Sequence, residues 1–200
     1  MKYKYILFDL DGTLTDPKVG ITKSVAYSLK KMRDMDVDTE ELTKFIGPPL
    51  KDSYMDFYDF TEEEAEEAIA CYREYFKETG IYENEVYDGI RQLLGRLQAL
   101  GHILVVATSK PTVFAETIIN HFDLEGYFTC IVGSYLDGRR TNKAEVIEAV
   151  INALSIHNEK NKVIMIGDRK HDIIGAKTVG VDAIGVIYGY GSYDELEKAG

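Results

Sequence analysis

The sequence predicts an α/β protein with a parallel sheet and an inserted helical domain. Three features of the 200-residue chain predict this fold. Five short apolar runs have the length of buried strands, segments with helical periodicity separate the later runs, and about ninety residues lie between the first run and the second. Buried strands that alternate with helices are typical of a parallel sheet covered on both faces. An interval of about ninety residues is far longer than a single crossover helix needs.

The predicted strands and helices alternate regularly after the long interval. The strands are residues 3–8, 103–107, 128–132, 163–166 and 183–186. The helices are residues 89–100, 111–122, 143–154 and 172–179, where apolar residues recur at helical spacing. Each of the later helices therefore connects two strands that run in the same direction, as a parallel sheet requires.

The long interval carries a helical pattern of its own. Residues 19–35 have apolar side chains at helical spacing, and Gly47-Pro48-Pro49 then interrupts the chain. Thr61 followed by Glu64 is a capping box, which predicts the start of a further helix. The aromatic side chains of this region are expected to pack within a small helical bundle. The predicted domains are a helical insertion, residues 16–83, and a sheet domain, residues 1–15 and 84–200.

Composition and charge exclude several classes of function. A net charge of −11 lacks the basic surface that binds a nucleic-acid backbone. It is compatible with a small phosphorylated metabolite as substrate, because a metal ion or a lysine reverses the local field. No apolar run is long enough for a membrane span, and the first strand begins too early for a secretory signal, so we expect a cytoplasmic protein. Cys71 and Cys130 lie outside any CxxC spacing and are expected to be reduced thiols, and no pattern predicts an oligomeric state.

Polar and charged residues follow the predicted strands. In chain order they are Asp9 and Asp11, Thr108 and Ser109, Lys143, and Asp168 and Asp172. Because the carboxyl ends of parallel strands meet at one edge of a sheet, we expect these side chains to lie close together. Clustered carboxylates are costly unless a cation neutralises them, and Mg²⁺ takes oxygen ligands. A cation, polar donors and a placed nucleophile are what phosphoryl transfer requires, so the set predicts a metal-dependent enzyme of that class.

Each of these features also has a purely structural explanation. Asp11-Gly12 is compatible with a hairpin turn, and Thr108 or Ser109 with a helix N-cap before a proline. Lys143 alone is typical of a solvated surface lysine, and acids such as Asp168 and Asp172 complement a helix dipole. Their occurrence at successive strand ends favours an active site over four separate coincidences. A loop at residues 188–191, Tyr-Gly-Tyr-Gly, either borders that site or is a plain surface loop.

The same residues form four motifs that resemble those of the haloacid dehalogenase-like phosphatases. The DxDGT motif is Asp9-Leu10-Asp11-Gly12-Thr13, and the GDxxxD motif is Gly167-Asp168-Arg169-Lys170-His171-Asp172. The threonine or serine of the second motif matches Thr108, and the lysine of the third matches Lys143. The resemblance covers nearly the whole chain. It implies a Rossmann-like core with a helical cap domain inserted after the first motif, in agreement with the long interval.

The resemblance also implies a chemical role for each motif residue. Asp9 is the expected nucleophile, which forms an aspartyl-phosphate, and Asp11 is expected to protonate the leaving alcohol and then to accept a proton from water. Thr108, Ser109 and Lys143 are expected to bind the phosphoryl oxygens. Since enzymes of the family that keep an acid at the second motif position transfer phosphate, Asp11 argues against dehalogenation.

A magnesium ion is the cofactor that the resemblance implies. Its expected ligands are the Asp9 carboxylate, the Asp11 backbone carbonyl and Asp168. Asp172 is expected to orient a metal-bound water or a neighbouring ligand.

The branch most similar to this chain contains phosphoglycolate phosphatase-like and 5′-nucleotidase-like enzymes. The segments that carry this similarity are residues 45–50 and 137–143. Phosphoglycolate or a nucleoside monophosphate is therefore the expected substrate, and Gly47 and Pro48 are the expected substrate contacts from the cap, with a helix-breaking turn as their alternative explanation. Two other functions stay open: a phosphomutase of the same family and a receiver-type phospho-accepting signalling domain. A receiver domain needs no inserted helical domain.

Overall fold

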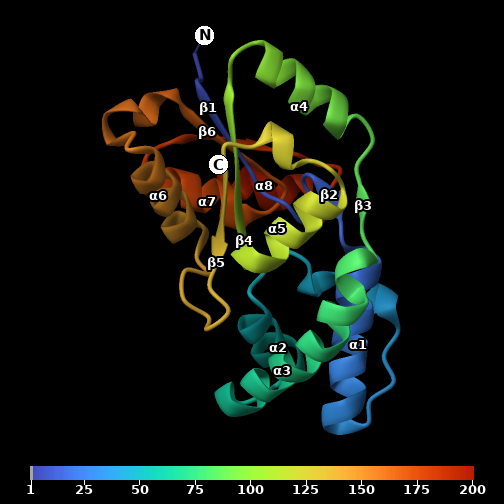
Figure 1. Ribbon diagram of the computed structural model, residues 1–200. Coiled ribbons are helices and arrows are strands. Elements are labelled where there is room, and N and C mark those ends of the chain that lie inside the picture. Colours follow the sequence, from blue (N-terminus) through green and yellow to red (C-terminus); the bar gives the residue numbers. More distant parts are fainter. Residues whose placement is uncertain (1) are drawn as a thin grey trace. The chain divides into compact units, whose positions relative to one another are not determined.

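A computed structural model describes residues 2–200, and within them five parallel strands form one sheet (Figure 1). The order across the sheet is β5–β4–β1–β6–β7. The strands are β1 (Tyr5–Phe8), β4 (Ile103–Pro111), β5 (Cys130–Ser134), β6 (Val163–Gly167) and β7 (Asp182–Gly185). All neighbouring pairs are parallel. The predicted α/β fold with a parallel sheet is therefore confirmed.

The first strand lies at the centre of this sheet. Phe8 at its end is paired with Val106 of β4 on one side and with Ile166 of β6 on the other. The ends of β1 and β6 therefore lie at the same level, at the carboxyl edge of the sheet, whereas β4 continues to Pro111. All four residues of β1 are buried, which explains why the strand is a continuous apolar run.

Helices cover both faces of the sheet (Figure 1). They are α4 (Ile90–Ala99), α5 (Thr112–His121), α6 (Lys143–Leu154), α7 (Lys170–Val179) and α8 (Tyr193–Ala199). On one face the apolar sides of α6 and α7 pack on alternate strand residues, including Leu7, Val105 and Met165. The other residues of β1, Ile6 and Phe8, point to the opposite face, and α4 and α5 contact β4. The predicted helix 143–154 is found with the same bounds, whereas α8 was not predicted.

The described chain divides into two compact units. One unit comprises the residues up to Asp16 together with Val86–Gly200 and contains the five-stranded sheet; the other is Pro17–Glu85. Two short strands, β2 (Thr15–Asp16) and β3 (Glu85–Val86), pair where the chain passes from one unit to the other. The sequence placed the insertion at residues 16–83, and its role as a cap stays a prediction.

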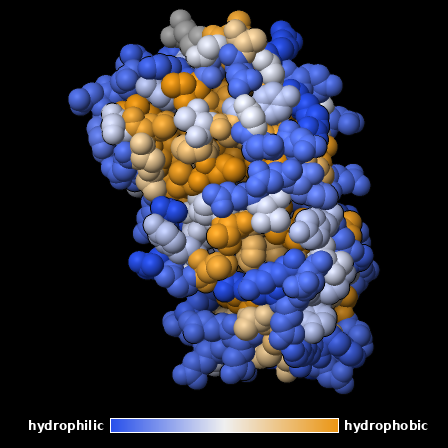
Figure 2. All heavy atoms as spheres, viewed as in Figure 1, coloured by the Kyte–Doolittle hydropathy of each residue, from blue (hydrophilic) through white to orange (hydrophobic). Residues whose placement is uncertain are grey.

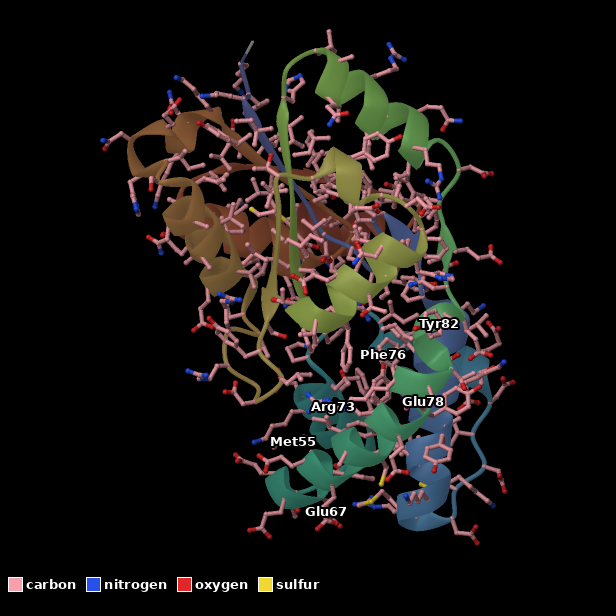
Figure 3. All side chains as sticks on the ribbon, viewed as in Figure 1. Met55, Glu67, Arg73, Phe76, Glu78 and Tyr82 are labelled. Atoms are coloured by element: carbon pink, nitrogen blue, oxygen red, sulfur yellow. The ribbon has the colours of Figure 1, made fainter. Side chains whose placement is uncertain are left out.

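The helical unit is built around aromatic side chains. Its elements are α1 (Lys18–Arg33), η1 (Thr39–Phe45), α2 (Leu50–Tyr58), α3 (Glu62–Glu78) and η2 (Gly80–Tyr82). Tyr54 of α2 is fully buried, and its hydroxyl is hydrogen-bonded to that of Ser28 on α1. Tyr72 and Phe76 of α3 are buried and their rings stack 5.2 Å apart. The aromatic residues therefore form a packing core, as the helical spacing predicted (Figure 3).

Polar residues cover most of the face shown in Figure 2, with smaller groups of apolar residues between them. Within residues 2–200, no helix combines the length and the apolar composition that crossing a membrane requires.

The predicted capping box begins α3. The Thr61 hydroxyl accepts a hydrogen bond from the Glu64 N–H (3.2 Å), and the Glu64 carboxylate accepts one from the Thr61 N–H (2.8 Å). We expect Thr61→Ala to lower the free energy of unfolding by about 1 kcal/mol, because the Glu64 N–H at the helix start loses its hydrogen-bond acceptor. Urea unfolding followed by circular dichroism measures this. The control is Glu67→Gln on the exposed side of the same helix (Figure 3), and an equal loss in both variants would contradict the prediction.

Candidate active site at the carboxyl edge of the sheet

The chain turns sharply after β1, and this turn positions the first two acids. The Asp9 N–H still donates to the Ile166 carbonyl of β6 (2.9 Å), and Asp9 Oδ1 accepts a hydrogen bond from the Leu10 N–H (2.8 Å). Gly12 has a φ of +83°, which favours glycine. A Cβ atom at Gly12 would lie 2.3 Å from Asp168 Oδ2. The glycine of the first motif is therefore also what lets the fourth motif approach the turn.

Three carboxylates converge at this edge. Asp9, Asp168 and Asp172 each offer one oxygen, and these oxygens lie within 4.8 Å of one another. All three residues are buried, so their charges cost free energy unless a cation neutralises them. Burial raises the pKa of Asp168 to about 7, and the negative charge of Asp9 contributes to this increase. A hydrogen bond from the Tyr190 N–H lowers the same pKa and offsets part of the increase. Burial also raises the pKa of Asp172, despite the lysine beside it.

Lys143 contacts two of the three clustered acids. It is the first residue of α6, whose N-cap Asn142 accepts a hydrogen bond from the Ala144 N–H (2.8 Å). Its Nζ lies 2.9 Å from Asp9 Oδ1 and 2.7 Å from Asp172 Oδ1, and it donates to the Ala107 carbonyl of β4 (3.1 Å). Burial alone would lower the pKa of Lys143, but the two carboxylates more than offset it and raise the pKa. The lysine is therefore a buried cation, which excludes the explanation as a solvated surface residue.

Thr108 and Ser109 follow on the strand beside β1. Thr108 is buried, and its hydroxyl accepts a hydrogen bond from the Lys110 N–H (3.2 Å); Ser109 is partly buried. The N-cap of α5 is Pro111, and no side chain caps this helix within the described residues. The alternative explanation of Thr108 and Ser109 as a helix cap is therefore wrong.

The alternative explanation of the last acid as a helix-terminus residue holds in part. Asp172 Oδ2 accepts a hydrogen bond from the Arg169 N–H (3.1 Å) at the start of α7. The same carboxylate contacts Lys143 through its other oxygen. Asp172 therefore serves both the helix start and the acid cluster.

The side chain of Asp11 contacts a different lysine from the one that contacts Asp9 and Asp172. Its Oδ2 is 2.8 Å from Lys110 Nζ, and both side chains are largely buried. Burial raises the pKa of Asp11, and Lys110 opposes that shift. The sequence predicted two roles for Asp11: its backbone carbonyl as a metal ligand and its side-chain carboxyl as the proton donor. The two predictions therefore concern different atoms.

Gly47 and Pro48 belong to the other compact unit. They lie in the bend between η1 and α2, where both are partly exposed and Gly47 has a φ of +105°. Their contact with substrate stays a prediction.

Sequence reasoning missed several residues that support the site. Lys110 was passed over because a single lysine beside a threonine is usually at the surface. The Tyr190 N–H donates to Asp168 Oδ2 (2.8 Å), so the loop at residues 188–191 borders the acid cluster. Arg169 Nε is 2.9 Å from Glu195 Oε1 of α8, which also accepts a hydrogen bond from the Lys170 N–H. No local pattern indicates these contacts, because they join segments far apart in the chain.

The donor set fits a hard divalent cation. Three carboxylates and the one lysine that contacts two of them leave a formal charge of −2 when all are ionised. Oxygen donors of this kind suit Mg²⁺ in ligand type, and a divalent ion would balance the charge. The arrangement as a whole combines three buried carboxylates that suit a cation with a buried ammonium group.

Comparisons with known proteins agree with this geometry. Residues 6–186 match the family described as haloacid dehalogenase-like hydrolase. The chain is 50% identical over 196 residues to a protein of Pseudomonas aeruginosa named 5′-nucleotidase, covering 98% of this chain and 88% of that protein. The crystal structure of a predicted phosphatase from Clostridium acetobutylicum has a TM-score of 0.96 and 55% identity, covering 100% of this chain and 92% of the other.

A more distant relative carries a different name. The chain is 37% identical over 193 residues to a protein of Mycobacterium tuberculosis named tyrosine-protein kinase PtkA. The match covers 96% of this chain but 65% of that protein, which is therefore the longer of the two.

The raised pKa of Asp168 predicts a pH-dependent stability in the absence of metal. The folded protein keeps this proton up to about pH 7, whereas the unfolded chain loses it near pH 4. Between these values the unfolded chain binds fewer protons, so this group makes the free energy of unfolding fall as the pH rises. We expect the wild type to lose up to about 1.4 kcal/mol per pH unit relative to Asp168→Asn over this range.

Chemical unfolding in the presence of a chelator, at a series of pH values, measures this difference. The control is Glu116→Gln at an exposed position of α5. A wild type and an Asp168→Asn variant with parallel pH profiles would contradict the prediction.

Proposed function

The chain belongs to the haloacid dehalogenase-like hydrolase family, and from this premise we propose that it is a Mg²⁺-dependent phosphatase of small phosphorylated metabolites. The observation that carries the proposal is the convergence of Asp9, Asp168 and Asp172 at one sheet edge, with Lys143 in contact with Asp9 and Asp172. Asp9 and Asp168 follow the ends of β1 and β6, and Lys143 and Asp172 lie in the first turns of α6 and α7. A structural role alone does not require three buried carboxylates to meet, because such a cluster destabilises a fold that binds no cation.

The proposed metal ligands are the carboxylates of Asp9 and Asp168 and the backbone carbonyl of Asp11, with Asp172 beside them. When bound, Mg²⁺ would supply positive charge for the phosphoryl oxygens and offset the charge of the acids. Lys143 supplies a second, permanent positive charge 2.9 Å from Asp9 Oδ1. Thr108 and Ser109 are the proposed hydroxyl donors to the phosphoryl group.

The proposed reaction has two steps with Asp9 as nucleophile. An Asp9 carboxylate oxygen attacks phosphorus, the bond from phosphorus to the ester oxygen breaks, and the Asp11 carboxyl gives its proton to the leaving alkoxide. Water then attacks the phosphorus of the aspartyl-phosphate, Asp11 takes back a proton, and the Asp9 carboxylate and inorganic phosphate are released. Since Asp9 Oδ1 is held by the Leu10 N–H and Lys143, its other oxygen is the one proposed to attack.

A nucleoside monophosphate is the proposed substrate. The relative from Pseudomonas aeruginosa, at 50% identity, is named a 5′-nucleotidase, and this favours a nucleotide over phosphoglycolate. The helical unit, Pro17–Glu85, is the proposed source of selectivity, with Gly47 and Pro48 as substrate contacts.

Three other activities give different products. A phosphomutase returns the phosphoryl group to its substrate, a receiver domain is phosphorylated once without turnover, and the name of the mycobacterial relative describes transfer to tyrosine. Release of inorganic phosphate over many turnovers distinguishes the proposed hydrolase from all three.

We expect Asp9→Asn to reduce multiple-turnover hydrolysis of p-nitrophenyl phosphate to the background rate, because an amide does not act as the nucleophile. Wild-type activity is expected to disappear with a chelator and to return when Mg²⁺ is added. Thermal unfolding checks that the variant is folded, and Glu116→Gln is the control for an exposed acid of the same unit. Undiminished turnover by folded Asp9→Asn would remove Asp9 from its role.

A panel of phosphate esters tests the substrate class. We expect kcat/KM for at least one nucleoside 5′-monophosphate to exceed that for phosphoglycolate by at least about tenfold, a difference of about 1.4 kcal/mol in transition-state binding. Phosphate release measured at equal Mg²⁺ concentration gives both values. A preference for phosphoglycolate would leave the phosphatase proposal standing and exclude the nucleotide.

A further inference from the structure

A second buried ion pair lies at the same sheet edge, between Asp11 and a lysine, Lys110, that has no part in the roles assigned above. Lys110 Nζ is 2.8 Å from Asp11 Oδ2, with 6% of the lysine side chain and 13% of the aspartate side chain exposed. The other oxygen, Asp11 Oδ1, is buried and has no hydrogen-bond partner among residues 2–200. The carboxylate is therefore held through one oxygen only. An ion pair that served stability alone would be expected to satisfy both oxygens.

The fold fixes the backbone of Lys110 from two sides. Its N–H donates to the Thr108 hydroxyl (3.2 Å), within the same segment of β4. The register of β4 against β5 shifts between Ala107 and Pro111, so this segment departs from regular pairing. On the neighbouring strand, a Cβ at Gly133 would lie 2.2 Å from the Lys110 carbonyl oxygen. Only a glycine allows the two strands to approach this closely. The backbone of Lys110 is therefore constrained at the position from which its side chain contacts Asp11.

We propose that Lys110 is a positioning residue for Asp11: it holds Oδ2 so that Oδ1 is the oxygen that exchanges the proton with the leaving group. The inference rests on the proposed function, in which Asp11 is the general acid. A charge-assisted hydrogen bond fixes the orientation of a carboxyl group more firmly than a neutral one. Lys143 cannot replace it, because Lys143 contacts Asp9 and Asp172.

The dependence of the rate on the leaving group distinguishes positioning of Asp11 from other roles of Lys110. An alkyl phosphate needs a proton on its leaving oxygen, whereas p-nitrophenolate leaves without one. The ratio kcat/KM reports the steps up to release of the alcohol and excludes the later hydrolysis of the aspartyl-phosphate. The substrates are p-nitrophenyl phosphate and the nucleoside monophosphate that the wild type hydrolyses best.

We expect Lys110→Met to lower kcat/KM for the alkyl phosphate by about 10²-fold or more, the size of a general-acid contribution. The loss for p-nitrophenyl phosphate is expected to be under about tenfold. Lys110→Arg keeps the charge and is expected to recover part of the alkyl phosphate activity. Lys198→Met, an exposed lysine of α8 in the same unit, is the control and is expected to match the wild type on both substrates.

Removing one member of a buried pair can unfold a protein, so the design includes a variant without an unpaired charge. In Asp11→Asn/Lys110→Met both partners are neutral, and its selectivity between the two substrates is expected to equal that of Asp11→Asn alone. Equal losses on both substrates in folded Lys110→Met or Lys110→Arg would overturn the proposal, as would no loss in either. A wild type that hydrolyses no phosphate ester would instead overturn the proposed function.

Discussion

Repulsion among buried carboxylates is the constraint on which the sheet-bearing unit depends. Asp9, Asp168 and Asp172 lie within reach of a single cation, and Lys143 offsets one of their three charges. Burial, together with the negative charge of Asp9, raises the pKa values of Asp168 and Asp172. Protonation of these acids therefore relieves the repulsion when no metal is present. Such a cluster lowers the stability of the fold, and a divalent cation bound there would balance its charge.

The architecture of the sheet makes the cluster possible. Parallel strands bring β1 and β6 to the same edge in fixed register, so the acids meet without a long loop between them. Contacts outside the cluster then hold the last motif in place: the Tyr190 N–H contacts Asp168, and Glu195 of α8 pairs with Arg169. The C-terminal segment thereby restrains the acid cluster although it supplies none of the three carboxylates.

Local sequence patterns predicted the strands, most helices and the acids. A strand that is buried on both faces is a continuous apolar run, and a helix start often carries a capping residue, so both can be recognised within a few residues. The capping box at Thr61 and the start of α6 at Lys143 are of this kind. The pairing of Lys110 with Asp11 was not predictable, since its two partners are separated by nearly half the chain and a lysine gives no sign of burial. The short helix α8 was missed although Ser192 followed by Glu195 is the same kind of start signal as Thr61 followed by Glu64, and the Ser192 hydroxyl accepts a hydrogen bond from the Glu195 N–H.

In the proposed reaction, two different lysines contact the two acids, Asp9 and Asp11, that lie two residues apart in the sequence. Asp9 Oδ1 is bound by Lys143 and by the Leu10 N–H, which leaves the other oxygen of Asp9 for the proposed attack. Asp11 Oδ2 contacts another cation, Lys110 of β4, and the buried Asp11 Oδ1 has no hydrogen-bond partner among the described residues. Environments that differ in this way are how enzymes divide attack and proton transfer between two carboxyl groups. A single shared lysine would bind both acids alike and would leave nothing to distinguish the acid from the nucleophile.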